Sequence, residues 1–128
     1  FDSAAIAAFN GRNNPDHFFW GEIANQLGRG EQFRAFWTAG PKAPDEKDWL
    51  ALFEGDRPIL ILFDEMPPYF HYLDTQKVGN GTVADIATRA FANLLTAAGK
   101  KKNVCVVVSD LAAAYDTGGR LINRALQD

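Results

Sequence analysis

The chain has 128 residues, 47% of them hydrophobic and 23% charged, so it can form one modest core but not two ordinary domains. Its formal net charge of -3 excludes the broad cationic surface that non-specific nucleic-acid binding requires. The single cysteine, Cys105, excludes a disulfide framework and is predicted to be a small buried side chain within an apolar run. No apolar run approaches the roughly 20 residues of a membrane helix, and these features together predict a cytoplasmic protein without a membrane partner.

Helices are predicted before the first strand of the chain. Apolar residues at helical spacing indicate one helix over 16–27 and another over 45–54, each followed by a glycine. The segment between them, 28–44, is less regular and is predicted to hold a short helix and a proline-containing loop. The chain begins Phe1-Asp2-Ser3, which is typical of the interior of a protein, and we therefore expect a fragment.

Two short segments, 59–63 and 104–108, are apolar throughout and rich in β-branched residues, which is typical of strands buried on both faces of a parallel sheet. Helical spacing over about 82–98, with Thr82 and Asp85 placed as a capping box, predicts a helix between them. A strand–helix–strand unit of this kind is a right-handed crossover. The predicted fold class is therefore α/β, with two parallel central strands joined by the crossover helix.

Acidic and polar residues follow both predicted strands. Asp64 and Glu65 follow the first strand, in the form of a Walker B motif, and parallel sheets bind ligands at this carboxyl edge. Asp64 is predicted to hold Mg²⁺, and Glu65 to orient and deprotonate the water that attacks the γ-phosphate of ATP. Ser109 and Asp110 follow the second strand and are predicted to sense the γ-phosphate, with an N-cap as the alternative role for Asp110.

A phosphate-binding loop is missing from this sequence, because no G-x-x-x-x-G-K-[ST] motif occurs in it. Such a loop holds phosphates with backbone amides and a lysine, so this chain alone is predicted not to bind ATP tightly. We expect the loop, the Walker A half of the domain, to lie upstream of Phe1.

Two segments resemble a known family. Residues 19–28 (Phe-Trp-Gly-Glu-Ile-Ala-Asn-Gln-Leu-Gly) and 58–65 (Pro-Ile-Leu-Ile-Leu-Phe-Asp-Glu), with Tyr69 after them, are similar to a group of large, poorly characterised prokaryotic AAA+ ATPases. These are found beside DNA methyltransferases and in phage-exclusion systems. The resemblance implies that residues 1–128 form part of one AAA+ domain, with the three-layer sandwich of P-loop NTPases. The Met66-Pro67-Pro68 segment departs from the family pattern, and the next helix is predicted to start near Pro68.

The resemblance also implies ligands and partners. The full-length parent would bind ATP and Mg²⁺, form a homo-oligomer, and couple ATP hydrolysis to the remodelling of a protein or nucleic-acid assembly. Asp64 and Glu65 would bind the nucleotide with its metal ion, and Arg120 or Arg124, on a helix predicted over 120–127, would be an arginine finger. The isolated fragment is expected to be inactive.

Two other functions are consistent with the same residues. In the first, the chain is a non-catalytic α/β scaffold or interaction module, and Asp64 and Glu65 only solvate the end of a strand. In the second, Asp64, Glu65 and Asp110 form a nuclease-like or toprim-like metal site, which divalent-metal-dependent cleavage of DNA would reveal. The basic run over 100–102 is predicted to be a solvated turn.

Overall fold

Three parallel strands lie at the centre of the structure, a computed structural model that describes residues 4–109. They are β1 (Ala5–Asn10), β2 (Ile59–Asp64) and β5 (Val104–Val108), in the spatial order β1-β2-β5. The parallel pairing of β2 with β5 confirms the predicted crossover. Strand β1 is not predicted by the sequence, because four of its six residues are alanine or asparagine and Ile6 alone is β-branched.

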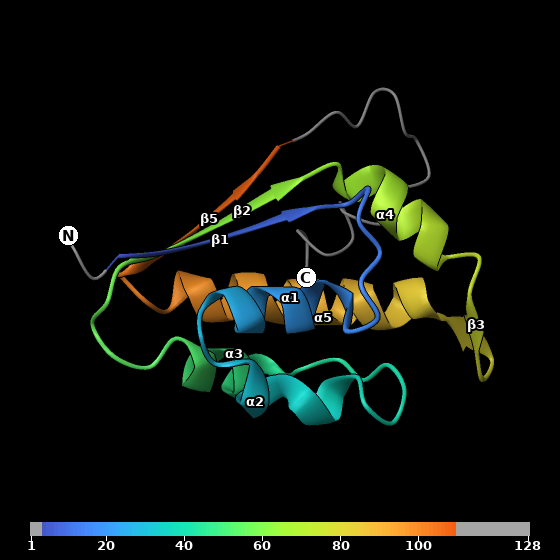
Figure 1. Cartoon of the computed structure of the whole chain (residues 1–128), viewed down its shortest axis with the longest axis horizontal. Helices are drawn as coiled ribbons and strands as arrows, with labels where there is room; N and C mark the ends of the chain where they lie inside the picture. The colour runs from blue at the N-terminus through green and yellow to red at the C-terminus, as the bar shows by residue number, and fades with distance from the viewer. Residues whose placement is uncertain (1–3, 110–128) are drawn as a thin grey trace.

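Helices cover one face of this sheet and continue beyond the carboxyl ends of its strands (Figure 1). They are α1 (Phe18–Gln26), α2 (Gly30–Phe33), the 3₁₀ helix η1 (Arg34–Phe36), α3 (Glu46–Leu52), α4 (Met66–Leu73) and α5 (Val83–Gly99), and a small hairpin of β3 (Lys77–Val78) and β4 (Gly81–Thr82) precedes α5. Helices α1 and α5 form the layer next to the sheet, and α2 and α3 form a further layer (Figure 1). The predicted capping box of Thr82 and Asp85 is present at the start of α5. No described helix is long and apolar enough to cross a membrane.

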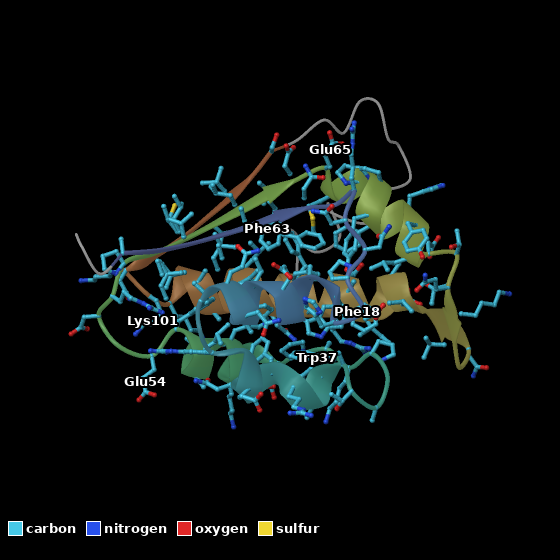
Figure 2. The ribbon with its side chains drawn as sticks, viewed as in Figure 1. Phe18, Trp37, Glu54, Phe63, Glu65 and Lys101 are labelled. Atoms are coloured by element: carbon cyan, nitrogen blue, oxygen red, sulfur yellow. The ribbon has the colours of Figure 1, made fainter. Side chains whose placement is uncertain are left out.

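Aromatic side chains fill the space between the sheet and the helices. Phe63 of β2 points into the helix layer (Figure 2). The centroid of its ring lies 5.7 Å from that of Phe19 in α1 and 5.1 Å from that of Phe91 in α5, and both pairs are edge-to-face. Trp20 and Trp49 are fully buried in the same core. Edge-to-face pairs contribute about 0.5–1.5 kcal/mol each beyond their buried area. This cluster fixes the orientation of β2, and hence of the residues at its carboxyl end.

The opposite face of the sheet is exposed in the described part of the chain. Ile6, Leu62 and Val107 are 62%, 36% and 47% exposed, and Cys105 is exposed as well. The predictions that both strands are buried on both faces and that Cys105 is buried are therefore wrong. The order β1-β2-β5 explains this outcome, because both connections step in the same direction along the sheet. Right-handed connections that step in one direction place all their helices on one face.

The outer edge of β1 is closed by a side chain of α1. Gln26 accepts the N–H of Ala8 through Oε1 at 2.7 Å and donates from Nε2 to the carbonyl of Ala8 at 2.9 Å. An amide side chain thus provides both hydrogen bonds that a neighbouring strand would provide. Glu22 accepts hydrogen bonds from Gln26 and His17, and these bonds, that of Gln26 first, lower the pKa of Glu22. Helix α1 and strand β1 are therefore fixed to each other.

Helix α4 begins at Met66, directly after β2, and not near Pro68 as predicted. Glu65, the N-cap residue, has left-handed backbone angles that turn the chain within one residue. Pro67 and Pro68 then lie in the first helical turn, where a backbone N–H has no partner within the helix, so their missing N–H groups cost little.

Candidate functional site

The carboxyl ends of the three strands bring polar residues into one row. Asn10 of β1 and Asp64 of β2 are directly paired in the sheet. The N–H of Ser109 donates to the carbonyl of Phe63 at 2.8 Å, which extends the β5 pairing so that Ser109 lies on the other side of Asp64. The structure therefore places Asp64 and Ser109 at one edge of the sheet, as their positions after parallel strands predict. Asp110, Arg120 and Arg124 lie outside the described residues.

An open hollow of about 440 Å³ lies over this row. Its polar lining consists of Asn10, Asn13, Asp64 and Ser109, and the remainder includes Ala8, Leu62 and Val107 of the exposed sheet face. Carboxylate, amide and hydroxyl oxygens are the ligands that Mg²⁺ prefers. Within residues 4–109 no group of three or more His, Cys, Asp and Glu side chains could hold a metal ion, and Asp64 is the one acidic residue among those described that line the hollow. This donor set suits a hydrated Mg²⁺ ion that is also bound by phosphate oxygens, and not a metal enclosed by protein ligands.

Glu65 is directed away from the hollow, toward the loop after β1. Its backbone angles are φ 59° and ψ 35°, a left-handed conformation that costs a residue other than glycine about 1–3 kcal/mol. Its Oε1 lies 3.4 Å from Nη2 of Arg12, and its side chain is only 13% exposed. Oε2 is buried without a hydrogen-bond partner. The two acids thus occupy different environments, Asp64 at the hollow and Glu65 beside a guanidinium group.

The end of β1 and the loop after it contribute residues that sequence reasoning missed. Asn10 and Asn13 line the hollow, Arg12 contacts Glu65, and the N–H of Gly11 donates to the carbonyl of Asp64 at 2.8 Å. The signal that indicates this loop is the polar run Asn-Gly-Arg-Asn-Asn-Pro directly after a short apolar segment. That signal depends on recognising β1 as a strand, and its alanine-rich sequence does not allow this.

Phosphate-binding features are missing from this edge of the described structure. Helix α4 starts here, but Pro67 and Pro68 remove two of the N–H groups with which a helix N-terminus binds an anion. The lysine run lies at the opposite end of the molecule, as the separation of Lys101 from Glu65 shows (Figure 2). There Lys100 pairs with Glu46, and Lys101 donates to a backbone carbonyl, which agrees with the predicted solvated turn. The described site therefore has acidic and polar groups for a metal ion and a water molecule, but no cradle for phosphate.

Comparisons with known proteins do not extend this picture. The chain matches no model of a known protein family, and it matches no curated protein and no solved structure. The function of the site is therefore inferred from its own residues and geometry.

Proposed function

We propose that this chain is part of an ATPase domain of the AAA+ type and supplies the acidic residues that bind its Mg²⁺ ion and activate the attacking water. The observation that carries the proposal is the row of Asn10, Asp64 and Ser109 at the carboxyl edge of a parallel sheet. Open α/β sheets bind nucleotides at this edge. Phosphoryl transfer needs positioned charges and a positioned water more than covalent chemistry, and a row of polar groups meets that need.

Each residue of the site has a role in this proposal. Asp64 holds Mg²⁺ directly or through its water molecules, and Ser109 contacts the γ-phosphate or the attacking water. Glu65 is the proton acceptor for that water; because its carboxylate faces Arg12 and not the hollow in this structure, the role requires the Glu65 side chain to turn toward the hollow when nucleotide binds. Arg12, at 3.4 Å from Oε1, keeps the Glu65 side chain at the sheet edge. These roles leave the binding of the β- and γ-phosphates to another segment.

The sheet has room for that segment. On the side of β5 away from β2, the described residues provide no neighbouring strand, and the adjoining face is apolar and exposed. A strand, phosphate-binding loop and helix placed there would complete the three-layer sandwich of P-loop NTPases. By resemblance to the AAA+ group, the complete protein would act as a homo-oligomer that remodels a protein or nucleic-acid assembly, and its arginine finger would be Arg120 or Arg124.

The test is a set of variants in the complete protein that contains this chain. Glu65→Gln is expected to lower the kcat of ATP hydrolysis about 10²–10⁴-fold, because the water loses its general base, while ATP binding is retained. Asp64→Asn is expected to abolish the Mg²⁺ dependence of nucleotide binding. Glu54→Gln, an exposed residue far from Glu65 (Figure 2), is the matched control and should hydrolyse ATP at the wild-type rate. Unchanged turnover in Glu65→Gln would remove Glu65 from the mechanism.

A non-catalytic interaction module is the second candidate, because the exposed apolar face of the sheet is typical of a binding surface. In that case neither Asp64→Asn nor Glu65→Gln changes any nucleotide-dependent property of the complete protein. Substitutions at Leu62 or Val107 would instead weaken its assembly with partners.

A further inference from the structure

The backbone of Glu65 lies in direct contact with Gly11, the first residue after β1. A Cβ atom added to Gly11 would overlap the carbonyl oxygen of Glu65 and would lie 2.7 Å from Cβ of Tyr69. Gly11 does not have a positive φ, so the requirement for glycine here is one of space and not of backbone conformation. Since the Glu65 oxygen and the Tyr69 Cβ belong to backbone or to a buried residue, neither can move aside easily.

We propose that Gly11 is a positioning residue for Glu65. The left-handed conformation of Glu65 turns its carbonyl group toward β1, and the missing side chain of Gly11 is what makes room for that carbonyl. The same conformation directs the Glu65 carboxylate to Arg12, the next residue after Gly11, at 3.4 Å. A side chain at position 11 therefore forces the Glu65 peptide to rotate, and the carboxylate loses its contact with Arg12.

Two further contacts make the loop and Glu65 move together. The N–H of Gly11 donates to the carbonyl of Asp64 at 2.8 Å, so the peptide groups before and after Glu65 are both in contact with Gly11. The Oδ1 of Asp64 in turn accepts the N–H of Glu65 at 2.9 Å. Rotation of the Glu65 peptide therefore also removes a hydrogen bond that orients the Asp64 carboxylate.

Nuclear magnetic resonance of the chain tests the structural half of this inference without any nucleotide. In Gly11→Ala we expect the scalar couplings of Glu65 to report a negative φ in place of the positive one. We also expect the Arg12 guanidinium signals to become insensitive to the substitution Glu65→Gln, which shifts them in the wild-type chain. Gly99→Ala is the matched control, because nothing lies within 4 Å of a Cβ added there, and it should leave both observables unchanged. A folded Gly11→Ala chain that keeps a positive φ at Glu65 and the Arg12 pair would overturn the inference.

A double variant keeps the test decisive if Gly11→Ala does not fold. Glycine at position 65 can adopt other backbone angles without strain and turn its carbonyl away from position 11. The pair Gly11→Ala with Glu65→Gly is therefore expected to fold and to recover most of the stability that Gly11→Ala loses. If the double variant is as unfolded as Gly11→Ala alone, the conflict lies with Tyr69 or another neighbour, and Gly11 has no specific relation to Glu65.

The catalytic half rests on the proposed function and has its own readout. In the complete protein, Gly11→Ala should lower the kcat of ATP hydrolysis about 10²-fold, because the general base is displaced by an ångström or more, with KM for ATP changed less than about twofold. If the wild-type protein hydrolyses no ATP, the proposed function fails while the magnetic resonance result still decides the role of Gly11. If hydrolysis occurs and Gly11→Ala changes the Glu65 backbone without changing kcat, the positioning role is refuted and the ATPase proposal stands.

Discussion

Tyr69 connects three segments that surround the candidate site. Its hydroxyl oxygen accepts the N–H of Phe19 at 3.1 Å at the start of α1, and its ring meets Phe9 of β1 edge-to-face at 4.8 Å. Burial raises the pKa of the Tyr69 hydroxyl, which therefore stays protonated and neutral. Phe18, just before the bonded N–H, has a φ of 60° and is the second strained residue near Tyr69 after Glu65. The Tyr69 hydroxyl thus holds the residue that follows the strained Phe18.

Removing the Tyr69 hydroxyl is expected to destabilise the protein. In Tyr69→Phe the buried N–H of Phe19 loses its acceptor, and an unsatisfied buried donor costs about 1–3 kcal/mol. Tyr72→Phe is the matched control, because Tyr72 lies on the same helix and is 43% exposed, so its free energy of unfolding should change little. Urea denaturation of both variants measures the difference. Equal losses in the two variants would show that the Phe19 contact contributes nothing specific.

At the scale of the elements, the link between α1 and β1 depends on an ionised carboxylate. The pKa of Glu22 in the folded chain lies below its ordinary value of 4.5, mainly because Gln26 and His17 donate hydrogen bonds to it. A carboxylate with a lowered pKa stabilises the fold at a pH above its unfolded pKa, and this contribution is lost as the pH falls through the folded pKa. Acid should therefore loosen Gln26 from the edge of β1.

The pH dependence of stability tests this link. At neutral pH Glu22→Gln is expected to be less stable than the wild type, and the difference should shrink as the pH falls from about 5 to about 3 because the wild type then protonates Glu22. Faster hydrogen exchange at the Ala8 amide should accompany the loss of the Gln26 contact. Glu31→Gln is the control, since the Glu31 side chain is 87% exposed and only faces Arg34 at 3.7 Å. A difference between wild type and Glu22→Gln that is independent of pH would contradict the prediction.

The elements with strong local signals are those that the sequence predicts. The apolar strand β2, the crossover helix α5 and its capping box of Thr82 and Asp85 each follow from spacing and composition within a single segment. Strand β1 does not, because alanine has no preference for strands and only the neighbouring β2 makes Ala5–Asn10 extended. The positive φ of Glu65 is likewise a tertiary effect, imposed by the contacts of Gly11 and by α4, and glutamate itself gives no sign of it.

The same limit applies to the candidate site. Asp64 and Ser109 are found from sequence because each directly follows an apolar run, and parallel strands end at one edge. Arg12 is not found from sequence, because its contact with Glu65 joins positions more than 50 residues apart and no local pattern reports such a contact. The exposure of Cys105 is missed for a similar reason, since a run of apolar residues does not reveal whether one or both faces of its sheet are covered.

At the scale of the whole molecule, the exposed apolar face is expected to make the chain associate with itself at high concentration. Leu62→Thr should reduce this association while changing the free energy of unfolding by less than about 1 kcal/mol, because Leu62 is already 36% exposed. Ile61→Thr, one residue away on the buried face, is the contrasting variant and should cost about 2 kcal/mol or more. Sedimentation velocity and urea denaturation measure the two effects. Association that persists unchanged in Leu62→Thr would assign it to another surface.

The amide of Gln26 also decides in which direction this sheet can widen. Because it satisfies both outward-facing backbone groups of Ala8, an incoming strand would first have to displace a side chain that is itself held by Glu22. In the described part of the chain, no side chain covers the outer edge of β5 in this way. Its sequence of valines and one cysteine also has no charged residue or proline that would disfavour pairing with another strand. An additional strand would therefore pair with β5 and not with β1. A strand added beside β5 would place Ser109 between two strands, whereas it now lies at the end of an edge strand.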